Sequence, residues 1–311
     1  MSEKYIKNYI NGALVPALSG KYLDNINPST AKVYSYFPDS GEADLEQAVE
    51  IAAQNFSAWT RLDPERRFRI LMRLADILEQ NQVEFARAEA LDTGKPISMA
   101  VNYDVPDAQA CFRYYATSIL HQQNTTKSTQ TAYIQLALRQ PIGVVACLAS
   151  WSMPLFTLCQ KIAPALAAGN CVIAKPSQYA PMTAFMLAQA CAEAGMPSGV
   201  LNIIHGQDAP LHEWITQHPK IQAIAYTGDS KAGTQIIRHA LPRLKKLSLN
   251  QGGNNANIIL EDCDFDKMMV GTLRSSFSNN GQLRHHASRI FIQRSKYEKF
   301  KIELVKRTQF L

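Results

Sequence analysis

The sequence predicts an α/β fold with a Rossmann-like, doubly wound parallel β-sheet, and two observations support this class. From residue 142 onward, short apolar runs alternate with amphipathic stretches. Near-continuous apolar strands that alternate with helices are typical of parallel sheets covered on both faces. The composition, 46% hydrophobic and 19% charged residues over 311 positions, is that of a globular protein with a packed core.

The first 120 residues are predicted to be helical after a short β start. Residues 44–59, DLEQAVEIAAQNFSAW, place apolar side chains on one face at helical spacing. Residues 64–81, PERRFRILMRLADILEQN, begin with proline, which is favoured at the first helical position. We expect a further helix to begin at Pro106.

The second half is predicted to supply the strands of the sheet. Six apolar runs are assigned as strands: 142–150, 171–176, 199–206, 221–228, 245–250 and 257–261. A helix between the second and third runs is expected to stop at Gly195 and Pro197.

Polar and glycine-containing segments follow four of these strands. They are Ser150–Pro154, Lys175–Gln178, His205–Gly206 and Thr227–Gly233. In open parallel sheets, ligands bind at the carboxyl ends of the strands. We therefore expect a binding site where these four segments meet.

These segments and their neighbours resemble the NAD(P)-dependent aldehyde dehydrogenase superfamily over nearly the whole chain. The similar stretches are INPSTAKV, QPIGVVACLASWSMPLF, YTGDSKAG, LNQGGNNANIILEDCDFD and NNGQLRHHASRIFI, in the family's order. The resemblance implies a sheet of the aldehyde dehydrogenase type. It also implies the family's activity, which oxidises aldehydes to acids with NAD or NADP through a thiohemiacetal and an acyl-enzyme.

The resemblance also implies how the protein is divided. We expect an N-terminal helical part of the nucleotide-binding domain (1–123), an oligomerisation hairpin (124–141), a Rossmann-like dinucleotide-binding part (142–266) and a remnant of the catalytic domain (267–311). The catalytic domain is thus expected to be incomplete, with the protein truncated at its C-terminal end. Exposed apolar surface and edge backbone then predict a homo-oligomer, or a mixed oligomer with an intact relative.

The family's chemistry needs a thiolate nucleophile, an oxyanion donor and a base. Those positions fall on Arg284, Ser152 and Asn250, where the family has Cys, Asn and Glu. A guanidinium has no lone pair to attack a carbonyl, and an amide does not accept a proton near pH 7. Serine is a shorter donor than asparagine, and loss of one oxyanion donor costs roughly 10²–10³ in rate. We expect a pseudoenzyme with no intact catalytic residue and no small-molecule substrate.

The cofactor site is mixed. The positions that the resemblance assigns to it are Ser150, Trp151, Lys175, Ser177, Gln178, Gly206, Thr227, Gly228, Asp229 and Gly233. Gln178 stands where NAD-preferring members often have Glu, so a 2′-phosphate is tolerable. Asp229 replaces a small hydroxyl residue, and its carboxylate either repels the pyrophosphate by roughly 4 kcal/mol or caps the helix itself. We expect binding of NAD or NADP to be weak or lost.

Two alternatives stay open at this point. The first is an active NAD(P)-dependent aldehyde dehydrogenase that uses other residues. The second is a structural or interaction protein with a basic C-terminal tail, because residues 284–311 hold eight Arg and Lys against two Glu and so account for the net charge of +6. A solvated helix end is the preferred interpretation of this tail, and nucleic acid is not expected as a partner.

Other features bear on location and metal binding. The six cysteines form no C-x-x-C pair, no run of about 18 apolar residues predicts a membrane span, and the N-terminus has no apolar signal region. A cytoplasmic protein is expected. Arg284, His285 and His286 could bind an anion or a metal, but adjacent histidines point apart on a regular element, so no metal is predicted.

Overall fold

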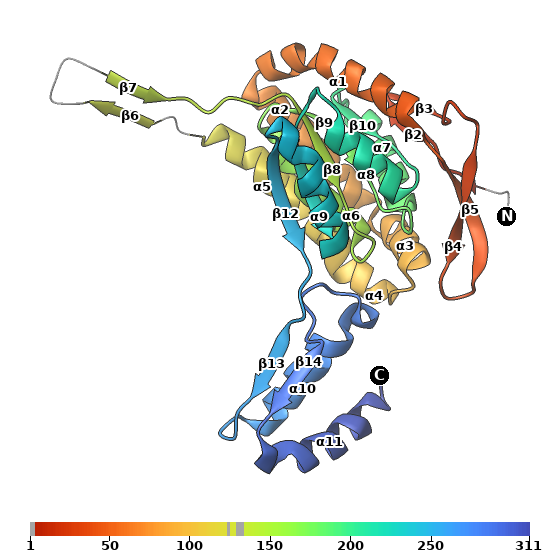
Figure 1. Cartoon of the computed structure of the whole chain (residues 1–311), viewed down its shortest axis with the longest axis vertical. Helices are drawn as coiled ribbons and strands as arrows, with labels where there is room; N and C mark the ends of the chain where they lie inside the picture. Colours follow the sequence, from red (N-terminus) through yellow and green to blue (C-terminus); the bar gives the residue numbers. More distant parts are fainter. Residues whose placement is uncertain (1–3, 123–124, 129–133) are drawn as a thin grey trace. The chain divides into compact units, whose positions relative to one another are not determined.

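The computed structural model describes residues 4–122, 125–128 and 134–311. The protein forms two compact units, Met1–Asn250 and Gln251–Leu311 (Figure 1). Among the described residues, no helix combines the length and apolar character needed to cross a membrane.

The first unit is built on a seven-stranded sheet. Its strands lie in the order β12 (Lys246–Gln251), β11 (Ile221–Gly228), β8 (Val144–Leu148), β9 (Cys171–Lys175), β10 (Leu201–Ile203), β2 (Asn8–Ile10) and β3 (Ala13–Val15). The pairs β11–β8, β8–β9 and β9–β10 are parallel, whereas β10–β2 and β2–β3 are antiparallel. The predicted doubly wound parallel sheet is therefore confirmed at its centre and corrected at one edge, where an N-terminal hairpin extends it.

Helices cover the sheet, and the predicted helices are present. They are α1 (Glu42–Arg61), α2 (Pro64–Gln80), α3 (Gln82–Thr93), α4 (Ile97–Met99), the π-helix η1 (Ala100–Asp104), α5 (Val105–Leu120), α6 (Pro154–Ala167), α7 (Met182–Glu193), α8 (Asp208–Gln217), α9 (Ser230–Ala240) and the 3₁₀-helix η2 (Leu241–Arg243). Asp63 caps α2 by accepting from the backbone N–H of Glu65, and Pro64 follows it. A separate three-stranded sheet has the order β1 (Lys4–Tyr5), β5 (Lys32–Pro38), β4 (Tyr22–Asn27).

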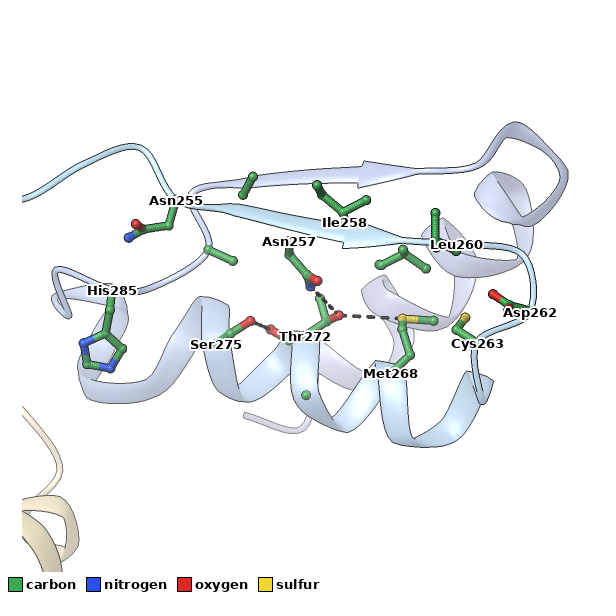
Figure 2. A pocket seen from close by; sticks show the side chains of 14 residues that line it. Asn255, Asn257, Ile258, Leu260, Asp262, Cys263, Met268, Thr272, Ser275 and His285 are labelled. Carbon is green, nitrogen blue, oxygen red and sulfur yellow. Dashed lines mark hydrogen bonds between the residues drawn. The ribbon is translucent and has the colours of Figure 1, made fainter.

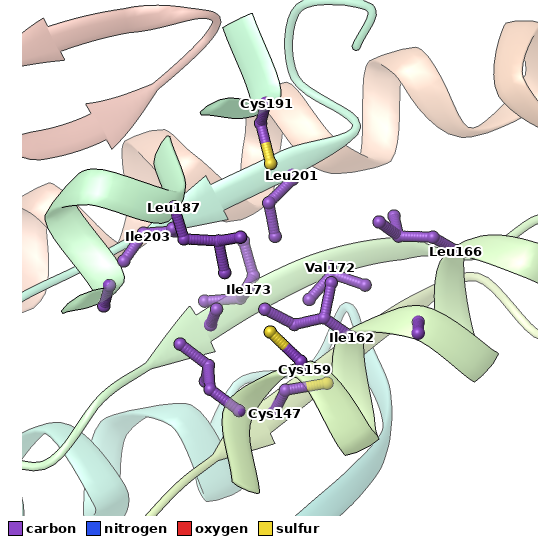
Figure 3. Packing of buried hydrophobic residues seen from close by; sticks show 14 of the residues in the cluster. Cys147, Cys159, Ile162, Leu166, Val172, Ile173, Leu187, Cys191, Leu201 and Ile203 are labelled. Atoms are coloured by element: carbon purple, nitrogen blue, oxygen red, sulfur yellow. The ribbon is translucent and has the colours of Figure 1, made fainter. Parts of the chain in front are cut away.

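The main core lies between the central strands and the helices that connect them. Figure 3 shows Ile162 from α6, Leu187 from α7 and Ile173 of β9 within this cluster, and all three are fully buried. Burying one such aliphatic side chain contributes about 1.5–3 kcal/mol. The core also contains Cys147 and Cys191, and burial raises the pKa of each thiol to about 12.

The hairpin expected over 124–141 contains two antiparallel strands, β6 (Thr125–Ser128) and β7 (Ile134–Ala137). Position 124 and positions 129–133 of that prediction lie outside the described residues. The assignment of this segment to oligomerisation stays a prediction.

The second unit is a small β-α-β arrangement followed by a helix. Its elements are β13 (Ala256–Ile259), α10 (Phe265–Phe277), the 3₁₀-helix η3 (Ser278–Gly281), β14 (Arg289–Ile292) and α11 (Arg294–Thr308), and β13 pairs with β14 in parallel. Ile259, Met269 and Phe300 form its buried core. A division at 266/267 would cut α10, whose Met269 shares this core with Ile259 of β13. The structure therefore divides before β13.

Candidate functional site

The carboxyl ends of four strands meet at one edge of the central sheet, because β11, β8, β9 and β10 are neighbours. Two backbone hydrogen bonds connect these ends: Ala149 N–H donates to the Lys175 carbonyl at 3.1 Å, and Ile204 N–H donates to the Ala174 carbonyl at 3.0 Å. The four segments that the sequence places at strand ends are thus brought together.

Lys175 ends β9, and its side chain is fully buried. Its ammonium forms an ion pair with the carboxylate of Asp208, the first residue of α8. Burial lowers the pKa of Lys175, and Asp208 opposes that shift by favouring the charged ammonium. The Asp208 side chain is 31% exposed, so the pair is enclosed on the lysine side and open to water on the aspartate side.

Gln178 is joined to the same aspartate by two hydrogen bonds. Its backbone N–H donates to Asp208 Oδ1 at 3.1 Å, and its side-chain Oε1 accepts from the Asp208 N–H at 2.7 Å. The second bond satisfies one of the N–H groups that a helix leaves unpaired at its start. Ser177 is buried, and its hydroxyl accepts from the Tyr179 N–H at 3.2 Å. The predicted contacts at Lys175, Ser177 and Gln178 are therefore engaged within the protein.

The turn between β11 and α9 is closed by Asp229. Its Oδ1 accepts from the Ala232 N–H at 2.8 Å, and its carbonyl accepts from the Tyr226 hydroxyl at 3.1 Å. A Cβ on Gly228 would lie 2.1 Å from that hydroxyl oxygen, so any larger residue would force the Tyr226 ring to shift. Gly233 is buried in the first turn of α9, with its N–H on the Asp229 carbonyl. The capping interpretation of Asp229 is confirmed.

Three buried polar side chains at this edge have no hydrogen-bond partner within the described part of the protein. They are Ser150 after β8, His205 after β10 and Thr227 at the end of β11. Burial, with Lys175 as a second cause, lowers the pKa of His205 to about 3, so its ring is neutral near pH 7. Buried polar atoms are ordinarily satisfied by protein or water, so these positions suit the polar groups of a ligand.

A cavity of about 470 Å³ lies between α8 and α9. It is lined by Ala209, His212, Glu213, Asp229, Lys231, Ala232, Gln235, Ile236 and His239. Burial lowers the pKa of His212 to about 4. The volume of the cavity and its lining of polar and apolar side chains suit part of a small organic molecule.

The turn that carries Trp151 and Ser152 rests on a buried charge cluster. Ser152 is buried, and its carbonyl accepts from Lys95 Nζ at 3.0 Å. The same ammonium contacts Glu89 Oε1 at 3.3 Å and the Asp104 carboxylate. Glu89 Oε2 in turn accepts from the Leu155 N–H, in the first turn of α6, at 3.4 Å.

This cluster and Asp208 were missed by the sequence analysis. Burial raises the pKa of Glu89 to about 7, although Lys95 works in the opposite direction. Glu89, Lys95 and Asp104 are scattered over α3, the segment after it and η1, and nothing in their spacing indicates a shared site. Asp208 has a signal, because an acidic residue at a helix start is a common stabilising choice, but its partner Lys175 lies far away in the sequence.

The other two positions that the resemblance assigns to catalytic residues are Asn250 and Arg284. Asn250 is exposed at the end of β12. Arg284 lies in the second unit, in the segment between η3 and β14, where Asn255 Nδ2 donates to the carbonyls of Arg284 and His286 at 2.7 and 3.2 Å. Arg284 and the strand-end residues therefore belong to different units.

The segment before Arg284 follows an unusual backbone path. Asn279, Asn280 and Gly281 have φ values of 55°, 57° and 72°. Asparagine and glycine are the residues that enter this left-handed region at least cost.

A second cavity of about 580 Å³ lies beside β13 and α10 (Figure 2). Asn257 Nδ2 donates to the Thr272 hydroxyl at 2.9 Å, and both residues line the cavity, as do Cys263 and His285. The ring of the neighbouring His286 instead contacts the Leu283 carbonyl. Within the described ranges, no three His, Cys, Asp or Glu side chains come together as a metal would need.

Comparison with known proteins gives a consistent result. A sequence model described as the aldehyde dehydrogenase family matches residues 15–311. The protein is 42% identical over 298 residues to the 2-aminomuconic semialdehyde dehydrogenase of Bos taurus, a match that covers 95% of this chain and 60% of the relative. It is 35% identical to the 2-hydroxymuconic semialdehyde dehydrogenase of Pseudomonas sp. (strain CF600), over 96% of this chain and 62% of the relative.

Solved structures agree. The NAD+ complex of an aldehyde dehydrogenase from Bacillus cereus superposes with a TM-score of 0.95 at 32% identity, covering 98% of this chain and 62% of that one. The protein thus spans about three fifths of the length of the relatives it matches.

Proposed function

Since the chain belongs to the aldehyde dehydrogenase family, we propose that it is a pseudoenzyme that keeps the nucleotide-domain fold and has lost the family's aldehyde chemistry. The observation that carries this proposal is Arg284, which stands at the position that the resemblance assigns to the nucleophile. A guanidinium stays protonated and has no electron pair to share with a carbonyl carbon.

The cysteines that the protein does contain support the proposal. Burial raises the pKa of Cys171 to about 12, as it does for Cys147 and Cys191, so these thiols stay protonated near neutral pH. Only a thiolate is an effective nucleophile. Cys263, in the second unit, packs against the small core of that unit.

The cofactor site supports weak or lost binding of NAD or NADP. Lys175 and Gln178 are already bonded to Asp208, and Asp229 places a carboxylate at the start of α9. The residues present therefore do not fit a dinucleotide in the conformation described. The unpartnered Ser150 and Thr227 side chains are the features that favour residual binding.

The proposed role is binding rather than turnover, in a homo-oligomer or in a mixed oligomer with an intact relative. The β6–β7 hairpin and exposed apolar side chains of the second unit, such as Ile258 and Ile302, support an association of this kind. The free cysteines of the described residues fit a reducing compartment, which keeps a cytoplasmic location as part of the proposal.

A second candidate is an active dehydrogenase of a muconic-semialdehyde type, favoured by 42% identity to a relative with that name. The basic tail gives less support to a nucleic-acid role, because several of its charges have partners. Arg307 pairs with Glu303 and Asp266, and Lys299 lies over the Phe265 ring at 4.2 Å.

Turnover measurements on purified protein separate these candidates. We expect no reduction of NAD or NADP above buffer with acetaldehyde, benzaldehyde or 2-hydroxymuconic semialdehyde. A triple variant, Ser152→Asn with Asn250→Glu and Arg284→Cys, restores the three family residues, and Cys263→Ala serves as a matched control. Turnover by the unaltered protein, or a covalent acyl adduct in its mass spectrum, would overturn the proposal.

A further inference from the structure

Asp208 contacts two of the residues that the resemblance assigns to the cofactor site. The Lys175 ammonium and the Gln178 N–H each meet its carboxylate. We propose that Asp208 is an internal ligand of the nucleotide site, and that its charge decides whether this protein binds NAD(P). The proposal rests on the proposed function only in taking this edge as the nucleotide site.

The burial of the two partners shows the order in which they lie. The Lys175 side chain is fully buried, whereas that of Asp208 is 31% exposed. The carboxylate therefore stands on the solvent side of the ammonium. A ligand group that approaches Lys175 from solvent has to displace the carboxylate, and so has to replace its ion pair and its hydrogen bond from Gln178.

A carboxylate also stands at the start of the next helix. Asp208 is the first residue of α8, and Asp229 caps α9 by accepting from the Ala232 N–H. Helix N-termini attract anions through their unpaired N–H groups and the helix dipole. Here each helix start already has a carboxylate of the protein itself, so an incoming pyrophosphate meets two negative charges.

Polar contacts for a ligand are nevertheless still present. Ser150, His205 and Thr227 are buried at the same strand ends without hydrogen-bond partners among the described residues. The cavity between α8 and α9 adjoins Asp229, which is one of its lining residues. The site is thus blocked by charge rather than by loss of its shape, and two substitutions should reopen it.

Calorimetric titration with NAD and with NADP tests this inference. The proteins are the unaltered protein, Asp208→Asn, and Asp208→Asn combined with Asp229→Ser. Removal of a charge at contact distance from an anionic ligand is expected to improve affinity at least about tenfold, and more in the double variant. Asp24→Asn, at an exposed position of β4, removes the same charge elsewhere and should leave affinity unchanged.

A further variant distinguishes binding at the opened site from a nonspecific gain in affinity for NAD or NADP. Lys175→Met added to Asp208→Asn removes the ammonium that the ligand would reach, and should abolish the gain. Thermal unfolding verifies that each protein is folded, and Asp208→Ser replaces Asp208→Asn if the asparagine variant does not fold.

Micromolar binding of NAD or NADP by the unaltered protein would overturn the inference. The same holds if Asp208→Asn and the double variant fold but show no gain in affinity. Neither result bears on the lost aldehyde chemistry, which is measured by turnover. Conversely, turnover by the unaltered protein would end the pseudoenzyme proposal and leave the affinity comparison between variants valid.

Discussion

Lys95 and Lys175 are completely buried within the described part of the first unit, and the surroundings of the two differ. Lys95 lies between Glu89 and Asp104, whose side chains are 0% and 2% exposed, and it also donates to the Ser152 carbonyl. Lys175 has the carboxylate of Asp208, which is 31% exposed. One cation is enclosed by its partners, and the other is covered by a partner that water can reach.

The difference indicates what each buried charge does. Burying an ion is costly unless opposite charges and hydrogen bonds compensate it, and removing one partner of an enclosed pair leaves an uncompensated charge. In the Lys95 cluster, two buried carboxylates and the Ser152 carbonyl surround the ammonium and join α3, η1 and the start of α6, so we assign it to structure. Solvent reaches the Lys175 pair on its Asp208 side, so a ligand can compete for it.

The largest expected effect is that of Lys95→Ala. It leaves Glu89 and Asp104 buried without their cation, and we expect the free energy of unfolding at pH 7.5 to fall by about 3–5 kcal/mol. Urea unfolding followed by circular dichroism measures this loss. Lys21→Ala, at an exposed position, is the matched control. An unchanged urea midpoint for Lys95→Ala would contradict the structural role assigned to the Lys95 cluster.

The next effect is a pH dependence in the same cluster. Burial raises the pKa of Glu89 from 4.5 to about 7, so the folded state keeps a proton that the unfolded state releases. Stability should therefore fall as pH rises between about 5 and 7, by about 2 kcal/mol. Glu89→Gln should flatten that slope, and a smaller slope should remain because burial also raises the pKa of Asp92 to about 6. An identical pH slope in the unaltered protein and in Glu89→Gln would contradict the assignment of this pH dependence to Glu89.

Asp208→Asn should cost less stability than Lys95→Ala. The Asp208 side chain is 31% exposed, so water can reach the Lys175 ammonium once the carboxylate is gone. We expect a loss of about 1–2 kcal/mol in the same urea assay. Equal losses for the two variants would show that the two lysines play the same role.

The smallest effect is expected for Gln178→Ala. The substitution removes the acceptor for the Asp208 N–H at the start of α8, which costs about 0.5–1 kcal/mol. Hydrogen exchange of the amides in the first turn of α8 should become faster. Gln207→Ala alters an exposed side chain next to that turn and should have less effect. Unchanged stability and unchanged exchange rates for Gln178→Ala would mean that the hydrogen bond from the Asp208 N–H to Gln178 contributes nothing.

Periodicity was sufficient to predict most elements of the first unit. Strands β8, β9 and β11 and helices α1 and α2 follow from local patterns of apolar residues, since burial on both faces or on one face leaves a direct trace in the sequence. The hairpin β2–β3 joins the main sheet through pairing of Ile203 with Tyr9. That pairing spans most of the unit, and no local pattern encodes it.

The site was predicted in outline for the same reason. Strand ends are local features, so Lys175, Gln178 and Asp229 were placed correctly at one edge. Asp208 and Lys95 were not identified because their roles depend on partners brought near by the topology. The contact of Lys95 with Ser152 joins residues 57 positions apart. A charged residue that follows a helix end has the same appearance whether it is solvated or buried.

The left-handed run Asn279–Asn280–Gly281 has a consequence for how such proteins diverge. Its path is imposed by backbone torsions that asparagine and glycine adopt at little cost, and it makes no demand on the chemistry of the residue three positions further on. In this protein the run precedes Arg284, whose guanidinium is compatible with this backbone path. The sequence motif of the loop therefore indicates its backbone path, whereas reactivity depends on which side chain stands at position 284.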